Sequence, residues 1–396
     1  AYVGGIVGYC DRASRLVLKN CRNAGSFALP AAELLTGTPF ETGADIAAML
    51  RKHGYTEAAD TLSDELGGAQ LRARIIGGVI GVNGTNQVVD GCVSTGAMNN
   101  LTALGGVVGL NEGLIVNCTL SGNLGSATQD YVGGIAGLNV GLPGTTLTMD
   151  GYTYAPGTIE NCSTDAGRTV TGQRAVGGIV GCNLLGGVVE SSDSRANVSG
   201  LSAVGGIAGE NEGTVIVTSA SGAVSRRVTG LTGGSGVGGI IGLNAKTGTL
   251  TARKTGTASD VLATDRGLTV TGHEKVGGVI GINAGAISVP SGGYLANNAL
   301  RVQASVGEAG GVIGAQEGTG VTLSCLKNTG ALVTASSGAA GGIIGVNAAG
   351  NALKDCLGQG SVTSSSGLSG GICAENFGTI DTCFVRAGGA EIDITS

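Results

Sequence analysis

The sequence is poor in aromatic residues, proline and charge. Its 396 residues include no tryptophan, five prolines, two histidines, 3% aromatic residues and 13% charged residues. The shortage of large rings excludes a core built on aromatic packing and removes the stacking surfaces on which sugars usually rest. The core must therefore be built from Val, Ile, Leu and Ala.

Basic clusters and long apolar runs are missing as well. The net charge is −6, the pI is near 5.0, and no Lys/Arg-rich patch occurs, so binding to nucleic acid is not expected. No uninterrupted apolar run reaches the roughly eighteen residues that a membrane-spanning segment needs, so no membrane insertion is expected. No signal peptide opens the chain. Because the repeats begin almost at once, we expect a fragment or mature product of a longer protein.

Glycine is abundant instead. The chain has 78 glycines while hydrophobic residues reach 42%, and this combination is unlike disorder, which needs low hydrophobicity and high charge. The strict third-residue glycine of collagen is also missing. Small β-branched side chains between frequent glycines favour short, tightly stacked strands.

A motif with two adjacent glycines recurs eleven times, and VGGIAGLN at residues 132–139 is a typical copy. The shortest spacing between copies is 28 residues, and larger spacings are this unit plus insertions. Such a period is typical of a solenoid. A helical unit is disfavoured because glycine costs about 1 kcal/mol at each helical position. The first glycines of the copies are Gly4, Gly77, Gly105, Gly133, Gly177, Gly205, Gly238, Gly277, Gly310, Gly341 and Gly370.

Three short strand-like runs are visible in each unit: the doublet strand, a second run such as residues 114–118, and a third run before the next doublet. Where the third run is longer, as at residues 168–171, its side chains alternate as in a half-buried strand. The sequence therefore predicts an all-β fold. We expect a single domain over residues 1–396, a right-handed parallel β-solenoid (β-helix) of about eleven coils.

Three positions of the motif predict how the coils stack. With the first glycine as zero, position +2 is Ile or Val in every copy, +4 is Gly in ten and +6 is Asn in nine. The +2 residues predict an aliphatic stack with a spacing of about 4.8 Å, and the asparagines predict a ladder of amide hydrogen bonds. Apolar residues at −1 and +2 break strand alternation, so we expect a bend at the doublet, with +2 favoured as the inward position. The singled-out members are Ile135, Ile179, Ile207 and Ile240 in the stack, and Asn111, Asn139, Asn183, Asn211 and Asn244 in the ladder.

Cysteine shows a related regularity. Six of the ten cysteines lie three positions after an apolar residue at the end of the second run, and Cys325 ends the second strand of its own coil. We predict buried thiols that act as small hydrophobic groups, with a disulfide between adjacent coils as the alternative. A zinc site is disfavoured because no C-x-x-C pair is present. The predicted structural thiols are Cys92, Cys118, Cys162, Cys325, Cys356 and Cys383.

Residues 26–74 interrupt the repeats. Helix-forming residues occur at 44–53 and 57–66, and Gly54 is a suitable C-terminal stop for the first helix. We predict a two-helix insertion between coil 1 and coil 2. We expect it to cover the open end of the solenoid, where strand edges are unpaired. His53 is expected to end an exposed helix.

The pattern Gly-Gly-Ile/Val-x-Gly-x-Asn-x-Gly-x-Ile/Val, present at residues 205–215 and 370–380, resembles the GLUG-type repeat of bacterial surface proteins. The resemblance covers nearly the whole chain outside the insertion. It implies a repeat segment of a large secreted or wall-anchored protein, such as an adhesin or the non-catalytic part of a surface protease. No catalytic residue comes with the motif.

A discontinuous acidic stripe is the only candidate for carboxylate chemistry that follows the repeat. Asp90, Glu160 and Asp381 lie two positions before the ladder cysteine of their coils. Paired carboxylates of this kind perform glycoside hydrolysis in other proteins. The equivalent positions in other coils hold Lys19, Val116 and Lys354, so a solvated face explains the stripe better.

These features predict a non-catalytic structural and adhesive segment of a bacterial cell-surface or secreted protein. We expect no cofactor and no metal, and a protein or glycan partner that contacts the loops between repeats. Two alternatives stay open. One is a carbohydrate-active or glycan-binding β-helix with Asp150 and Asp260 in its longer loops. The other is a filament subunit that associates end to end through its outer strands.

Overall fold

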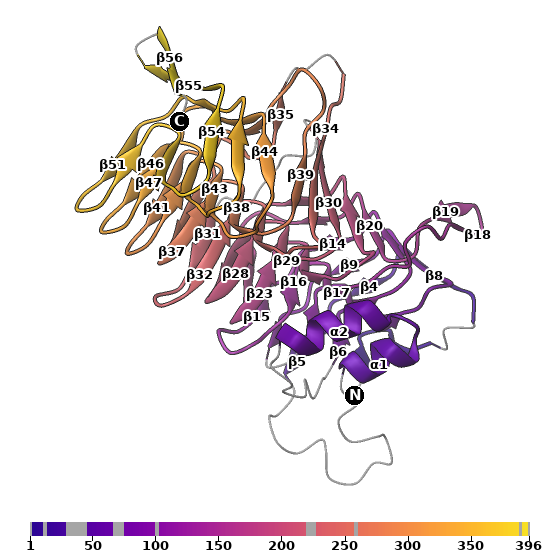
Figure 1. The fold of residues 1–396 in the computed structure, drawn as a ribbon. Helices are drawn as coiled ribbons and strands as arrows, with labels where there is room; N and C mark the ends of the chain where they lie inside the picture. Colours follow the sequence, from indigo (N-terminus) through magenta and orange to yellow (C-terminus); the bar gives the residue numbers. More distant parts are fainter. Residues whose placement is uncertain are drawn as a thin grey trace.

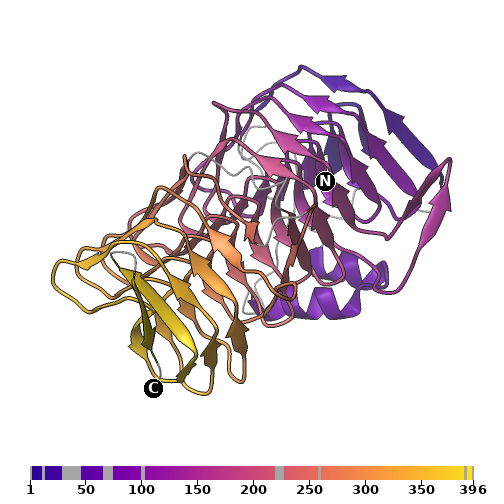
Figure 2. The same ribbon diagram turned by 90° about the horizontal axis from the view of Figure 1, so that it is seen from above.

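The computed structural model describes residues 2–10, 14–28, 46–65, 75–99, 103–218, 227–256, 260–387 and 390–394. The chain winds into one long stack of parallel strands, with the N-terminal coils at one end and the C-terminal coils at the other (Figures 1 and 2). The predicted all-β parallel solenoid is confirmed.

Each coil begins with two short strands on either side of the glycine doublet. Sheet A contains the strands before it: β1 (Tyr2–Gly4), β6 (Ile75–Gly77), β11 (Leu104–Gly105), β16 (Val132–Gly133), β23 (Arg174–Gly177), β28 (Ser202–Gly205), β32 (Ser235–Gly238), β37 (Glu274–Gly277), β42 (Ala309–Gly310), β47 (Ala340–Gly341) and β52 (Ser369–Gly370). Sheet B contains the strands after it: β2 (Val7–Tyr9), β7 (Ile80–Asn83), β12 (Val108–Asn111), β17 (Ala136–Asn139), β24 (Val180–Asn183), β29 (Ala208–Asn211), β33 (Ile241–Asn244), β38 (Ile280–Asn283), β43 (Ile313–Gln316), β48 (Ile344–Asn347) and β53 (Cys373–Asn376).

Three further sheets complete the coils of the N-terminal half. Sheet C contains β3 (Leu16–Lys19), β8 (Gln87–Asp90), β13 (Leu114–Val116), β20 (Thr158–Glu160), β25 (Val188–Glu190), β30 (Thr214–Thr218), β34 (Thr249–Arg253) and β39 (Ala286–Ser288). Sheet D contains β4 (Arg22–Asn23), β9 (Val93–Ser94), β14 (Thr119–Leu120), β21 (Ser163–Thr164) and β26 (Asp193–Ser194). Sheet E runs almost the full length and contains β5 (Phe27–Ala28), β10 (Met98–Asn99), β15 (Leu124–Gly125), β22 (Thr169–Thr171), β27 (Asn197–Gly200), β31 (Arg227–Gly230), β36 (Thr269–Gly272), β41 (Arg301–Ala304), β46 (Leu332–Ala335) and β51 (Val362–Ser364).

The later coils use different strands on the side opposite the doublet. Sheet F contains β35 (Val261–Leu262), β40 (Leu295–Asn297), β45 (Leu326–Asn328), β50 (Leu357–Gly358), β55 (Cys383–Ala387) and the antiparallel β56 (Ala390–Ile394). Sheet G contains β44 (Thr322–Ser324), β49 (Ala352–Lys354) and β54 (Thr379–Asp381). A complete coil thus has five strands rather than the three expected runs. One extra strand arises because the doublet strand is split in two. The other is the strand of sheet D, which is only two residues long and does not stand out in the sequence.

The bend predicted at the doublet is present. β11 ends at Gly105 and β12 begins at Val108. A Cβ atom on Gly105 would lie 1.6 Å from Val108 O, so only glycine permits this tight return of the chain. Val107 and Val108 are both fully buried in the main core. The expectation that favoured position +2 as the inward position is therefore incomplete, because the bend turns +2 and +3 inward together.

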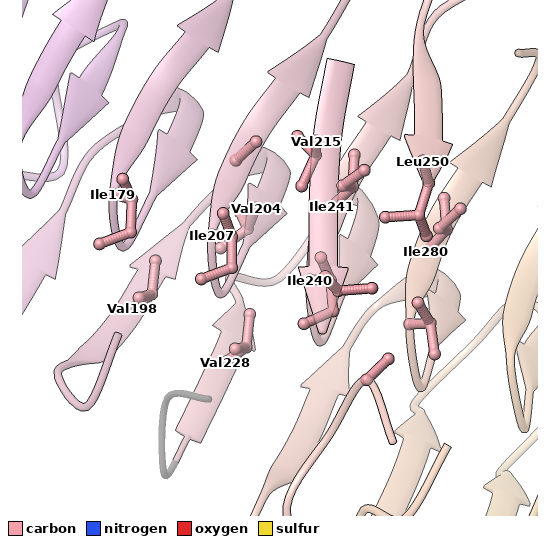
Figure 3. Packing of buried hydrophobic residues seen from close by; sticks show 14 of the residues in the cluster. Ile179, Val198, Val204, Ile207, Val215, Val228, Ile240, Ile241, Leu250 and Ile280 are labelled. Carbon is pink, nitrogen blue, oxygen red and sulfur yellow. The ribbon is translucent and has the colours of Figure 1, made fainter. Parts of the chain in front are cut away.

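The core is a column of aliphatic side chains along the stack. Ile135, Ile179, Ile207 and Ile240 all belong to it. Figure 3 shows Ile179, Ile207 and Ile240 on successive coils, with Val198 and Val228 of sheet E in the same cluster. Full burial of one such side chain contributes about 1.5–3 kcal/mol, so the repeated column is the main source of stability.

Two helices, α1 (Ile46–Lys52) and α2 (Thr56–Glu65), lie between β5 and β6 in the sequence. Gly54 follows α1 with a φ of +89°, as expected for a C-terminal stop. The helices pack on the outer face of sheets A and B along coils 2 to 5, where Leu50 and Leu62 join Leu110 and Leu138 in a second apolar cluster (Figure 1). The two described helices lie on this flank, where outward-facing apolar residues contact them, and not over the open end as expected. The rest of the insertion, residues 29–45 and 66–74, lies outside the described residues.

Candidate functional site

The predicted asparagines form a continuous hydrogen-bonded ladder. Each is fully buried, and its Nδ2 donates to the side-chain oxygen of the next coil at 2.7–2.8 Å. A neutral amide can donate and accept at once, so one residue type satisfies its neighbours on both sides. The ladder links the coils and offers no group to a ligand. Its predicted members are Asn111, Asn139, Asn183, Asn211 and Asn244.

One step of this ladder is broken. Asn283 Nδ2 donates to Gln316 Oε1 at 2.7 Å, and Asn347 Nδ2 donates to Asn376 Oδ1 at 2.7 Å. Between them, Gln316 Nε2 and Asn347 Oδ1 are buried without a hydrogen-bond partner among the described residues. The extra methylene of Gln316 therefore leaves a complementary donor and acceptor unpaired.

The cysteines of sheets C and D form a second ladder. The backbone N–H of Cys92 donates to Cys118 Sγ at 3.3 Å, and that of Cys118 donates to Cys162 Sγ at 3.4 Å. In the next coil Ser192 takes the same place, since Cys162 N donates to Ser192 Oγ at 3.1 Å. Cysteine spacing alone missed Ser192, although it lies three positions after Val189. These are free thiols that close a turn through hydrogen bonds as well as packing.

Cys92 and Cys118 of this ladder are poor nucleophiles. A hydrogen bond with Cys118, together with burial, raises the pKa of the Cys92 thiol. A hydrogen bond with Cys162 does the same for Cys118, so both remain protonated at neutral pH. Cys356 and Cys383 are also buried. They form the C-terminal counterpart of this ladder.

The prediction that Cys325 belongs to the ladder is wrong. Cys325 N donates to Lys354 O at 3.1 Å and Asp355 N donates to Asp381 O at 3.1 Å, so Cys325 aligns with Asp355. Its φ of +57° places it in the left-handed turn before the ladder position, which Leu326 occupies. The sequence contained the signal, because the apolar residue lies two positions before Cys325 rather than three.

The acidic stripe exists but is divided and neutralised. Asp90 and Glu160 both pair with Val116 in sheet C, whereas Asp381 lies in sheet G beside Lys354. Lys354 Nζ is 3.9 Å from Asp381 Oδ2. The stripe therefore behaves as a solvated face with charge pairs.

An antiparallel hairpin, β18 (Leu147–Met149) and β19 (Tyr152–Tyr154), leaves coil 4 and covers part of this face. Its Met149 and Tyr154 pack against Val88 and Leu114 on the outer side of sheet C. The hairpin thus extends back over earlier coils.

The hairpin also holds Asp90 in place. Tyr152 Oη donates to Asp90 Oδ2 at 2.7 Å, and Asn117 Nδ2 donates to Asp90 Oδ1 at 2.9 Å. Burial tends to raise the pKa of Asp90, but the hydrogen bonds from Asn117 and Tyr152 and the charge of Lys19 lower it overall. Asp90 is therefore an ionised positioning group for the hairpin, a role the sequence did not reveal.

The two loop aspartates proposed for a carbohydrate-active site lie on separate coils. Asp150 is at the tip of the hairpin, with its side chain 60% exposed and Oδ1 4.0 Å from Arg15 Nη2. Asp260 Oδ2 accepts a hydrogen bond from Lys327 Nζ at 2.8 Å. The structure does not bring them together, and each has a basic partner.

A polar hollow of about 240 Å³ lies beside the last strands of sheet D. One of its carboxylates is already used, because Ser121 Oγ donates to Asp165 Oδ2 at 2.5 Å. The thiol of Cys162 is also engaged, because its Sγ donates to Glu160 O at 3.2 Å. Asn161 Nδ2 donates to Asn117 Oδ1 at 2.6 Å, and Thr164 Oγ1 donates to Ser194 Oγ at 2.9 Å, so much of the polar lining is engaged within the protein. The lining residues are Asn161, Cys162, Ser163, Thr164, Asp165, Ser191, Asp193 and Arg195.

Two carboxylates on the outer face of coil 6 are fully buried, Glu210 and Glu212. Arg174 Nη2 lies 3.6 Å from Glu210 Oε2. Burial and the negative charge of Glu210 raise the pKa of Glu212 to about 8. Glu212 is therefore mostly protonated at neutral pH, another feature that sequence patterns did not reveal.

Within the part of the chain that the structure describes, no group of three or more His, Cys, Asp or Glu side chains is placed to hold a metal ion. Neither described helix is long and apolar enough to cross a membrane. No protein-family model, curated protein or solved structure matches the chain.

Proposed function

We propose that this chain is a non-catalytic structural and adhesive segment of a bacterial cell-surface or secreted protein. It acts as a rigid stalk, and its insertions and outer faces contact a protein or glycan partner. The buried asparagine ladder from Asn83 to Gln316 carries this proposal, because it links successive coils by short side-chain hydrogen bonds over most of the stack.

The state of the titratable groups supports a non-catalytic role. The Cys92 and Cys118 thiols are held protonated, Asp90 is engaged by Tyr152 and Asn117, and Asp260 is paired with Lys327. A general acid or base must reach the proton it transfers and have a suitable pKa, and groups occupied in this way are poorly placed for that work.

The test is incubation of the purified chain with plant, algal and bacterial polysaccharides, with released sugar ends measured by colorimetry. We expect no turnover. Turnover that disappears in Asp150→Asn or Asp260→Asn would replace the proposal with the carbohydrate-active alternative, which has its candidate carboxylates at these two loops.

A second role, end-to-end association, is favoured by apolar side chains on the outermost coils. Ile6 is 44% exposed in the first coil and Phe377 is 65% exposed in the last. Strand edges with exposed apolar residues favour pairing with another chain. Light scattering that shows a strict monomer at high concentration would exclude this role.

A further inference from the structure

A hollow of about 190 Å³ lies at the rim where sheet E turns into sheet A, on coils 6 to 8. Its lining contains no carboxylate, lysine or arginine, and it includes two glycines. Drug-sized ligands use pockets of roughly 300–1000 Å³, so this hollow suits a single small ring or one unit of a longer chain. The lining residues are Gly230, Thr232, Thr271, Gly272, His273, Gln303 and Ser305.

The alternation of sheet E turns these polar groups outward. Val228, Val270 and Val302 pair in register and are fully buried, so residues on either side of them face away from the core. Figure 3 shows Val228 within the apolar cluster. A Cβ atom on Gly272 would point inward, 2.8 Å from Val237 Cγ2, so the chain presents only backbone outward at this position. Thr271 and His273 therefore flank a bare backbone floor.

Two polar side-chain atoms at this face have no hydrogen-bond partner among the described residues. They are His273 Nδ1 and Thr229 Oγ1, and both are buried. Thr229 lies directly next to Thr271 in the sheet, and Thr271 lies next to Gln303. A buried polar atom without a partner is unfavourable. His273 belongs to the lining of the hollow, whereas Thr229 lies on the strand beside it.

The same face carries two exposed arginines. Arg227 and Arg301 lie two residues before Thr229 and Gln303 and are exposed, with Thr269 between them in the register. No ion pair of either arginine occurs within the described part of the chain, whereas Arg253 on sheet C is 2.9 Å from Glu190.

The strands β31, β36 and β41 contain no Asp or Glu, although the chain has 28 acidic residues. The carboxylate nearest in sequence is on Glu274, which directly follows His273, begins β37 of sheet A and lies beside Gly307. The sheet E side of the hollow is therefore locally basic on an acidic protein, and an anionic group is favoured there.

We propose that this face binds an acidic glycan, with one sugar ring in the hollow and its carboxylate or sulfate group on Arg301 and Arg227. Thr271, Gln303, Ser305 and His273 contact the hydroxyl groups. Arginine suits both anions because its fork donates two parallel hydrogen bonds. The inference rests on the proposed adhesive function and names the ligand class for it. Strands β31, β36, β41, β46 and β51 follow one another in sheet E, and Figure 1 shows this side of the stack, so an extended glycan can cross several coils.

The test is titration calorimetry of the full chain with polygalacturonate, dextran sulfate and neutral dextran at physiological salt. We expect binding to one or both acidic polymers and at least tenfold weaker binding to dextran. Polygalacturonate and dextran sulfate distinguish a carboxylate from a sulfate as the recognised group. Arg301→Gln and Gln303→Glu should each weaken binding at least fivefold. Arg253→Gln is the matched control, because it removes an exposed arginine from another face, and it should bind as the parent does.

Three outcomes would overturn the inference. They are equal binding to neutral dextran, unchanged binding by both site variants, or equal binding to single-stranded DNA, which would indicate general polyanion attraction. Binding to no glycan overturns it too, while leaving the stalk proposal intact, because that proposal is tested by the lack of turnover. Circular dichroism of each variant excludes misfolding, which outward-facing substitutions should not cause.

Discussion

His53 Nδ1 lies 2.6 Å from Glu112 Oε1, and this contact joins the helical insertion to the third coil of the solenoid. The Glu112 side chain is fully buried and that of His53 is 13% exposed. The expectation that His53 ends an exposed helix is therefore wrong. The pair complements the apolar packing of α1 and α2 on the same flank.

Replacement of His53 by Leu should weaken the docking of both helices. It leaves the buried Glu112 carboxylate without this partner, and breaking a buried pair in this way costs about 3 kcal/mol. Urea unfolding should show the loss in stability, and amide hydrogen exchange should show faster exchange in α1 and α2. The control is Asp60→Asn, which breaks the exposed Arg51–Asp60 pair at 2.7 Å and should cost below about 1 kcal/mol. Equal losses in the two variants would contradict this account.

The position of the insertion shows what the sequence could and could not reveal. Repetition at +2, +4 and +6 follows directly from stacking, so the coil count and both ladders were predictable. The docking site depends on outward-facing residues that no repeat rule marks. Position +5 is apolar at Leu110 and Leu138 under the helices, but it is also apolar at Leu243 and Ile282, which are outside the second cluster. Sheet D was missed for another reason: strands of two residues are too short to show alternation.

Replacement of Gln316 by Asn should stabilise the protein. The shorter side chain restores the spacing of the ladder, so that its Nδ2 can donate to the unpaired Asn347 Oδ1. One added hydrogen bond contributes about 1 kcal/mol. Thermal unfolding is the measurement. The reverse change, Asn211→Gln, should create a similar gap in an intact part of the ladder and lower the stability by about 1–3 kcal/mol. A loss of stability in Gln316→Asn would show that the gap is not a defect of amide spacing.

The thiol ladder should tolerate serine better than valine. Ser192 already makes the hydrogen bonds of a ladder cysteine, so Cys118→Ser should keep them and change stability little. Cys118→Val matches the size but leaves the backbone N–H of Cys92 without its acceptor, at a cost of about 1–3 kcal/mol. Calorimetry compares the variants. If the two substitutions are equivalent, the thiols act through packing alone.

Alkylation of the native protein should separate the thiols by burial. Cys21 is half-buried, whereas Cys92, Cys118 and Cys162 are buried and hydrogen-bonded. We expect iodoacetamide to modify Cys21 in the folded state and the other three only after unfolding, as measured by peptide mass spectrometry. Rapid modification of Cys118 in the folded protein would contradict the ladder geometry.

Glu212 should make the protein less stable as the pH rises. Burial and the charge of Glu210 raise its pKa from the ordinary value of 4.5 to about 8. Between these values the folded chain holds a proton that the unfolded chain releases, so the free energy of unfolding falls with increasing pH. At about 1.4 kcal/mol per pH unit, the full effect is of the order of 5 kcal/mol.

Glu212→Gln removes this titration and should resemble the parent near pH 4 but exceed its stability at pH 9. The matched control is Glu160→Gln, which changes an exposed carboxylate on sheet C and should leave the parent's pH dependence in place. The measurement is the free energy of unfolding in urea at several pH values. Parallel pH profiles for the parent and Glu212→Gln would contradict this account, because they would mean that the Glu212 carboxylate is ionised and solvated in the folded state.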